Sequence, residues 1–160
     1  MASRVIPVEP FDLVIFGGTG DLARRKIMPS LFRRYLAGQM PPEARVIGAA
    51  RAELTDQGYR DIIAAAIAEF GGAEAQDPRL PAFLERLHYV TIDATGDGGW
   101  ATLAGLMRAD VVRVFYFSVA PSLFGALAER LHGHAIASDQ SRIVVEKPFG
   151  RDLATARALN

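Results

Sequence analysis

Apolar residues along this chain follow two alternating patterns, short continuous runs and longer stretches of one-sided helical period. The continuous runs are rich in β-branched and aromatic residues, which is typical of buried strands. They cover residues 11–16, 46–49, 87–92, 111–119 and 143–145. The helical stretches cover residues 21–37, 55–70, 100–107 and 122–131. This alternation requires crossover connections, so it predicts an α/β fold: a doubly wound parallel sheet, Rossmann-like, with helices on both faces.

Small polar residues and glycines mark the predicted ends of these elements. Gly17 and Gly18 close the first strand, and Gly38 ends the first helix. Thr55 stands where an N-cap of the second helix is expected. Residues 71–81 follow neither pattern and are expected to form a long surface loop.

The doubly wound architecture also predicts where a ligand binds. In doubly wound sheets the ligand lies beyond the carboxyl ends of the strands. The residues expected to gather at that edge are 17–21, 50–51, 93, 118–121 and 146–148.

The composition favours one compact domain over all 160 residues, because half of them are hydrophobic and 22% are charged. The formal net charge is zero, which disfavours nucleic-acid and membrane-surface partners. The chain has no cysteine, and no segment approaches the about 20 apolar residues of a membrane span. A cytoplasmic location is therefore expected.

The turn after the first strand carries the first candidate chemistry. A glycine turn between a strand and a helix lets a pyrophosphate approach the backbone and the helix N-terminus. Gly17 suits the tight turn, Gly20 leaves room for the phosphate, and Ala23 allows close helix packing. Thr19 suits either a helix cap or a phosphate donor, and Asp21 suits a first-turn acid. An ordinary strand-to-helix loop is the alternative.

Basic residues stand at two further strand ends. Arg51 occupies the place where an acidic residue would hold the ribose 2′-hydroxyl of NAD, and a guanidinium there suits the 2′-phosphate of NADP. A solvated surface arginine is the alternative. Lys147 follows the last strand and is expected to point toward the cleft, although a simple turn residue also fits. Lys26, on the first helix, has no assigned role from position alone.

Neither metal nor hydrolytic chemistry is indicated. His88 lies within a strand and is expected to be packed, while His132 and His134 lie at a helix end where the dipole favours them. Further metal ligands are not identifiable near them, and no Ser, His and Asp set has a defensible spacing. We therefore assign no catalytic residue and no metal ligand.

Four segments together resemble one family. They are GGTGDLARRK from Gly17, GAAR from Gly48, FYFSVAP from Phe115 and IVVEKPFGRDL from Ile143. In this order they resemble the coenzyme domain of the glucose-6-phosphate dehydrogenases of the pentose phosphate pathway. The match requires the glycine turn and the EKPFG segment, which follow two strands far apart in the sequence, to fit the family at the same time. It is therefore more specific than a glycine loop alone.

The resemblance implies roles for particular residues. The coenzyme loop would comprise Gly17, Gly18, Thr19, Gly20, Asp21 and Leu22, with Thr19 and Arg51 at the 2′-phosphate and Asp93 and Ala94 beside the adenine. Lys26 and Lys147 would reach the sugar phosphate, Lys147 would also touch the nicotinamide end, and Pro148 would set the peptide geometry between the two ligands. Ala52 and Glu53 depart from the family pattern, which lowers the expected preference for NADP and leaves NAD possible.

The resemblance also implies that residues 1–160 lack part of the family's catalytic residues. The family's RIDHYLGKE segment, with an aspartate, a substrate-binding histidine and a lysine, would follow Asn160. We therefore expect residues 1–160 to form the NAD(P)-binding domain without the β+α domain that supplies the base and the homo-oligomer contacts. Alone, the chain is expected to be inactive toward glucose 6-phosphate.

Two other functions were considered. A free-standing NADP-binding regulatory module without catalysis stays open as the alternative. A short-chain or epimerase-type enzyme shares the glycine turn but needs a lysine four residues after a tyrosine, which none of Tyr35, Tyr59, Tyr89 and Tyr116 has.

Overall fold

The computed structural model describes residues 10–138 and 141–145, and its central element is a parallel sheet. The strands of this described part are β1 (Phe11–Phe16), β2 (Arg45–Ala50), β3 (Leu87–Thr91), β4 (Val112–Phe117) and β5 (Arg142–Val145). They are ordered β3-β2-β1-β4-β5, and every neighbouring pair is parallel. The predicted doubly wound, Rossmann-like fold is confirmed, with the change in strand order at β1.

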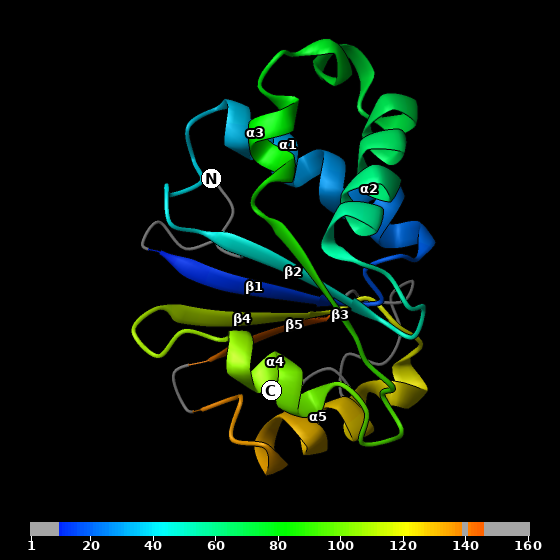
Figure 1. Cartoon of the computed structure of the whole chain (residues 1–160), viewed down its shortest axis with the longest axis vertical. Helices are drawn as coiled ribbons and strands as arrows, with labels where there is room; N and C mark the ends of the chain where they lie inside the picture. The colour runs from blue at the N-terminus through cyan, green and yellow to red at the C-terminus, as the bar shows by residue number, and fades with distance from the viewer. Residues whose placement is uncertain (1–9, 139–140, 146–160) are drawn as a thin grey trace.

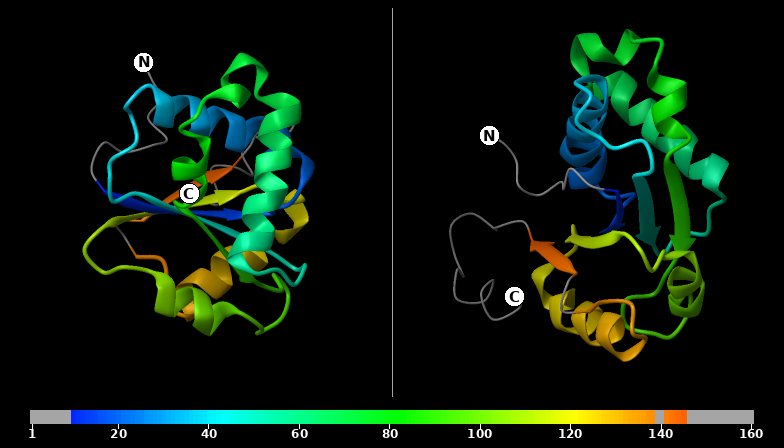
Figure 2. Two further views of the ribbon diagram at one scale, coloured as in Figure 1. Left: turned by 45° about the horizontal axis from the view of Figure 1, so that its top comes forward. Right: turned by 90° about the vertical axis from the view of Figure 1, so that its left-hand side faces the viewer.

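Helices cover both faces of the sheet (Figures 1 and 2). One layer holds the π-helical segment η1 (Ala23–Ile27) and the helices α1 (Met28–Leu36), α2 (Asp56–Phe70) and α3 (Leu80–Leu84). The other layer holds α4 (Trp100–Leu106) and α5 (Phe124–Gly133). Two 3₁₀ turns complete the described elements, η2 (Gly72–Gln76) and η3 (Pro121–Leu123). Among the described residues, no helix is long and apolar enough to cross a membrane.

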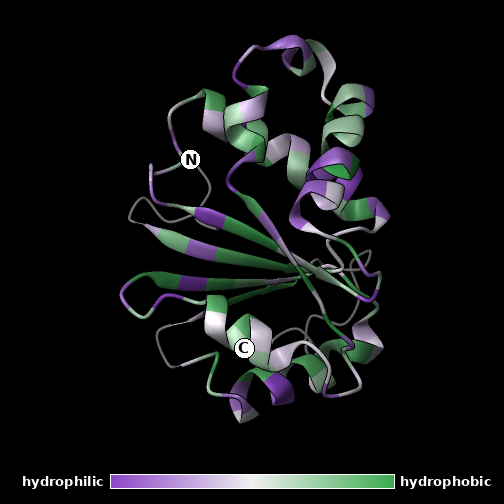
Figure 3. Cartoon of the chain, viewed as in Figure 1, coloured by the Kyte–Doolittle hydropathy of each residue, from purple (hydrophilic) through white to green (hydrophobic). Residues whose placement is uncertain are grey.

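The strands alternate their side chains between two apolar clusters. Leu13 and Ile15 of β1 belong to the cluster beneath α1 and α2, whereas Val14 and Phe16 belong to the cluster against α4 and α5. All six residues of β1 are buried, as the continuous apolar run predicts. The strands are accordingly largely green in the hydropathy colouring of Figure 3.

The first helix differs from its predicted form. A single helix was expected over residues 21–37, but the chain forms π turns over Ala23–Ile27 before α1 begins. Pro29 lies in the first turn of α1 and has no N–H to donate to the carbonyl of Arg25. A wider turn before the proline relieves this conflict. The predicted end of the helix at Gly38 is confirmed, with φ of 74° at that glycine.

Residues 71–81 lie mostly at the surface as predicted, but they do not form one long loop. The 3₁₀ turn η2 occupies part of that stretch and α3 begins at Leu80. Pro81 fits the first turn of α3, and Phe83 is the buried residue of this short helix, 5.2 Å from the Phe32 ring. A helix of five residues is too short to show a periodic apolar pattern.

A buried carboxylate lies at the amino end of β1. Asp12 has no solvent exposure and accepts hydrogen bonds from Arg45 Nε at 3.1 Å and Arg108 Nη2 at 2.6 Å. Burial raises the pKa of Asp12, but the hydrogen bonds from Arg45 and Arg108 outweigh it, so the pKa lies below 3.8. The cluster joins β1 and β2 to the segment after α4, at the sheet edge opposite the glycine turn.

Candidate functional site

The turn after β1 requires glycine for steric reasons. Gly17 has φ of 83°, and a Cβ atom there would lie 2.0 Å from the carbonyl oxygen of Ser118. Its N–H donates to Ala49 O at 2.8 Å, which holds the turn against the end of β2. The tight turn expected at Gly17 is therefore confirmed.

The next glycines are packed against their surroundings to different degrees. A Cβ at Gly18 would lie 2.8 Å from Tyr59 Oη, while one at Gly20 would meet only Gly17 O, at 3.3 Å. The Tyr59 hydroxyl donates to Gly18 O at 3.0 Å, and Gly20 N–H donates to Gly17 O at 3.0 Å. The tightest steric demand thus falls on Gly17 and Gly18, and Gly20 stays accessible, as expected for a residue that faces a ligand.

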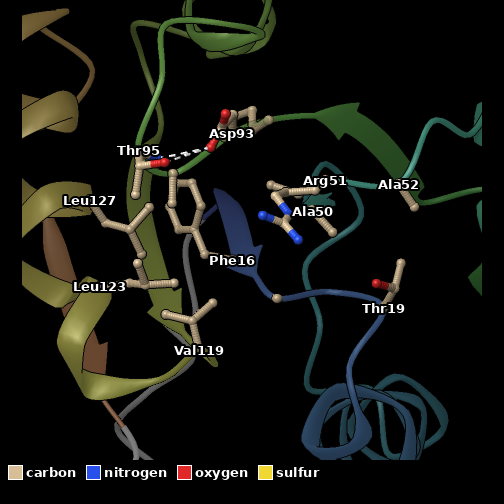
Figure 4. A pocket seen from close by; sticks show the side chains of 14 residues that line it. Phe16, Thr19, Ala50, Arg51, Ala52, Asp93, Thr95, Val119, Leu123 and Leu127 are labelled. Atoms are coloured by element: carbon tan, nitrogen blue, oxygen red, sulfur yellow. Dashed lines mark hydrogen bonds between the residues drawn. The ribbon is translucent and has the colours of Figure 1, made fainter.

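A cavity of about 490 Å³ opens beside this turn, beyond the carboxyl ends of β1, β2 and β3 (Figure 4). Its polar lining residues are Thr19, Arg51, Asp93 and Thr95, and its larger apolar ones are Phe16, Val119, Leu123 and Leu127, which lie together on one side in Figure 4. Gly17, Ala49, Ala50, Ala52, Ile92 and Ala94 complete the wall. The edge where the sequence predicts a ligand therefore carries a cavity of the size of known ligand sites.

Arg51 lies on the wall of this cavity with its guanidinium between Phe16 and Thr19 in the view of Figure 4. The side chain is exposed, and within residues 10–138 and 141–145 it forms no hydrogen bond or ion pair. Arg24, by comparison, donates to Asp21 at 2.8 Å and to Thr19 O at 3.0 Å. Arg51 therefore has donors available for a ligand anion.

The loop after β3 forms another part of the wall. The Asp93 carboxylate accepts hydrogen bonds from Thr95 N and Thr95 Oγ1, each at 3.0 Å. These bonds from Thr95, backbone first, lower the pKa of Asp93 below 3.8, with a smaller contribution from Arg51. The indole N–H of Trp100, the first residue of α4, donates to Asp93 O at 3.1 Å and holds the loop against that helix. Asp93 and Ala94, expected beside the adenine, thus both line the cavity.

Other predicted site residues lie outside this wall. Asp21 is exposed at the start of the first helix and is paired with Arg24 at 2.8 Å, and Leu22 packs against the first apolar cluster. Lys26 is exposed within η1. Lys147 and Pro148 lie outside the described residues, so the expectation for them is neither confirmed nor contradicted.

The apolar residues of the cavity wall were not predicted from the sequence. Phe16 was assigned to a buried strand, and Leu123 and Leu127 were assigned to the helix after Pro121 without a role at the cavity. Leu123 ends the 3₁₀ turn η3 and Leu127 lies in α5. Their spacing of four residues is compatible with one helical face, but only tertiary packing turns that face toward the cavity. No signal within the segment itself separates this face from ordinary core.

None of the three histidines lines the cavity. His88 is partly exposed, with Nδ1 3.3 Å from Asp56 Oδ2, so it is less packed than expected. His132 and His134 lie at the end of α5 as predicted, and the His134 ring stacks 6.0 Å from the Trp100 ring. In the described part of the chain, no three His, Cys, Asp or Glu side chains are grouped as metal ligands.

Comparison with known proteins decides the family. Residues 14–160 match the family model described as "Glucose-6-phosphate dehydrogenase, NAD binding domain". The chain belongs to this family. It is 44% identical to the glucose-6-phosphate 1-dehydrogenase of Rhizobium meliloti (strain 1021), over 100% of this chain and 33% of that protein.

Solved glucose-6-phosphate dehydrogenases share the fold over almost the whole chain. The crystal structure of the Mycobacterium avium enzyme has a TM-score of 0.82 and 34% identity, and the match covers 94% of this chain and 32% of that one. A glucose-6-phosphate dehydrogenase in complex with its substrate glucose-6-phosphate has a TM-score of 0.79 and 28% identity, over 99% of this chain and 34% of that one. The chain thus spans about a third of the length of the curated relatives it matches, and that third is their dinucleotide-binding domain.

Proposed function

We propose that the cavity binds the adenosine part of NADP and that the chain is the coenzyme domain of an enzyme that oxidises glucose 6-phosphate. The observation that carries this proposal is Arg51, an arginine without a hydrogen-bond or ion-pair partner among the described residues, on the cavity wall that also holds Thr19. A guanidinium binds phosphate through two parallel N–H donors. Arg51 and Thr19 would bind the 2′-phosphate.

The remaining wall fits the rest of the coenzyme. Gly17 lines the cavity, and Gly18 and Gly20 belong to the same turn, which leads into the start of the first helix. A glycine turn at this place supports pyrophosphate binding. Asp93 and Ala94 would lie beside the adenine, and the apolar side of the cavity would cover its ring. Asp21 and Leu22 would shape this loop from outside the cavity.

Selectivity for NADP over NAD depends on the balance of charge near Arg51. Asp93, whose pKa lies below the ordinary 3.8, carries a negative charge at neutral pH as an ordinary aspartate does, and it attracts the guanidinium of Arg51. Glu53 lies two residues after Arg51 in the chain and is exposed. These carboxylates reduce the local positive potential, so we propose a preference for NADP that leaves NAD as a weaker ligand.

The whole enzyme would transfer hydride from C1 of glucose 6-phosphate to the bound nicotinamide, giving 6-phosphoglucono-1,5-lactone. Within this chain, we assign Lys26 and Lys147 to the sugar phosphate, Lys147 also to the nicotinamide end, and Pro148 to the peptide geometry between the two ligands. The relatives' names and the substrate complex of a related structure support this assignment. Homo-oligomer contacts would come from the part of the relatives that this chain does not span.

Calorimetric titration of Arg51→Ala with NADP and NAD tests the proposal. Loss of a charged hydrogen-bond donor costs about 1.5–3 kcal/mol, so NADP affinity should fall about tenfold to a hundredfold. NAD affinity should change less than about twofold, because NAD has no 2′-phosphate.

Arg33→Ala is the matched control. Arg33 lies on α1, away from the cavity, and its guanidinium donates to Ser30 Oγ at 3.3 Å. Its replacement should leave both affinities unchanged. An equal loss of NADP and NAD affinity in Arg51→Ala would remove the 2′-phosphate role.

A further inference from the structure

The backbone on both sides of Arg51 is held by one buried phenol. The Tyr89 hydroxyl lies 3.1 Å from Ala50 O and 2.5 Å from Ala52 O, the carbonyls that flank Arg51. Thr91 Oγ1 also donates to Ala52 O, at 3.2 Å. The direction of the Arg51 Cα–Cβ bond is therefore fixed from β3, through hydrogen bonds that span 37 and 39 residues.

Arg51 depends on this support because its own side chain is not held. The guanidinium has no hydrogen bond or ion pair to any residue in the described ranges. Only its backbone and a weaker attraction to Asp93 determine where it lies. Holding a binding group in place before the ligand arrives lowers the entropy lost on binding.

A second tyrosine holds the glycine turn in the same way. The Tyr59 hydroxyl donates to Gly18 O at 3.0 Å, and the Tyr59 and Tyr89 rings lie 5.0 Å apart between α2 and β3. Burial raises the pKa of both phenols above 10.0, so both stay protonated as donors at neutral pH. The two hydroxyls thus act on different loops of one cavity.

We propose that Tyr89 is a positioning residue for selectivity between NADP and NAD, and that Tyr59 positions the turn that binds the part common to both coenzymes. The inference rests on the proposed function of the cavity. Tyr89 acts through Arg51, which only the 2′-phosphate would contact. Tyr59 acts through Gly18, beside the site assigned to the pyrophosphate.

Titration of the 160-residue chain with NADP and NAD, in Tyr89→Phe and Tyr59→Phe, tests this division. Each change removes one hydroxyl and keeps the ring. Tyr89→Phe should weaken NADP about threefold to tenfold more than NAD, the effect of one hydrogen bond. Tyr59→Phe should weaken both coenzymes by the same factor. A merely structural role would lower the melting temperature and leave the NADP-to-NAD affinity ratio at its wild-type value.

A double-mutant cycle shows whether Tyr89 acts through Arg51. In an Arg51→Ala background, Tyr89→Phe should no longer change the affinity ratio. Thr91→Val, which removes the other donor to Ala52 O, should shift the ratio in the same direction as Tyr89→Phe, by a smaller factor, and covers the case in which Tyr89→Phe fails to fold.

The outcomes separate the two proposals. If Arg51→Ala lowers the ratio but Tyr89→Phe and Thr91→Val do not, the positioning role is wrong and the coenzyme site stands. If Arg51→Ala leaves the ratio unchanged, the proposed 2′-phosphate site is wrong, and the role of Tyr89 is wrong with it.

Discussion

Single residues differ in how far their sequence neighbourhood determines their role. Gly17 was predictable because a glycine between a buried strand and a helix has few other uses, and its positive φ agrees. Arg51 was predicted at the edge that carries the cavity, but whether its side chain has a hydrogen-bond or ion-pair partner depends on residues distant in sequence, and it has none in the described part of the chain. The phenols that hold Gly18 and Ala50 come from 41 and 39 residues away, and no local pattern indicates them.

Asp12 is the buried carboxylate of the described residues, and the stability of the fold depends on its ionisation. Its pKa in the folded chain lies below the usual 3.8, so its stabilising effect is complete above that value and is lost as the pH falls through the folded pKa. Asp12→Asn at pH 7 should lower the free energy of unfolding by about 3 kcal/mol, since Arg45 and Arg108 lose a charged partner. The difference between variant and wild type should shrink when urea unfolding is repeated below pH 4.

Asp77→Asn is the control for this measurement. Asp77 also has a lowered pKa, through hydrogen bonds from Arg79, but this pair lies at the surface. Its replacement should leave the urea midpoint nearly unchanged. An Asp12→Asn variant as stable as wild type at pH 7 would show that the buried cluster contributes no net stability.

At the scale of elements, periodicity predicted the strands and longer helices, and it failed where an element is short or interrupted. The helix α3 has five residues and a single buried side chain, Phe83, so it leaves no repeating signal. The π segment before α1 arises from a backbone conflict at Pro29, which does not alter the apolar pattern. Neither the short helix α3 nor the π hydrogen-bonding pattern before α1 changes the spacing of apolar residues, so neither could be predicted from that spacing.

The packing of α2 on β2 depends on a glycine in the strand. A Cβ at Gly48 would lie 2.3 Å from Tyr59 Cζ, so Gly48→Ala would push the tyrosine away from Gly18. Urea denaturation should show a loss of about 1–3 kcal/mol, typical of overpacking, and coenzyme titration should show weaker binding of both NADP and NAD.

Gly105→Ala provides the matched glycine control. Gly105 lies in α4, and a Cβ there meets nothing within 4 Å. Replacement by alanine in a helix should keep or raise the stability by about 0.5–1 kcal/mol. If Gly48→Ala is as stable as wild type, Tyr59 is not confined by the strand as described.

At the scale of the whole molecule, the fold and the ligand edge followed from the order of the elements alone, because a doubly wound sheet brings the carboxyl ends of its strands together. The boundaries and depth of the cavity did not follow, since they depend on how η3 and α5 place Leu123 and Leu127 beside Phe16. The sequence thus predicted the edge that carries the cavity, and packing determined which residues form its wall.

The 160-residue chain should bind coenzyme without oxidising glucose 6-phosphate. Proton removal from the sugar hydroxyl needs a base within hydrogen-bond reach. His88 lies within β3, and His132 and His134 lie at the end of α5, so none of the three lies beyond the carboxyl ends of the strands. General-base assistance alone contributes a factor of about 10²–10⁴. At saturating glucose 6-phosphate and NADP, the absorbance of NADPH should stay at background. A free-standing NADP-binding module would give the same result. Turnover close to that of a longer relative would mean that a base lies within these residues.

Backbone amide chemical shifts, recorded by NMR during NADP titration, test the central claim most directly. If the cavity is the coenzyme site, the largest shifts will occur at Gly17, Thr19, Gly20, Arg51 and Ala94, and replacing NADP with NAD will reduce the shifts at Arg51 and Thr19 most. Amides near Arg33 and Gln39, on the far side of α1, should not move. Shifts confined to that surface, or equal patterns for NADP and NAD at Arg51, would contradict the account.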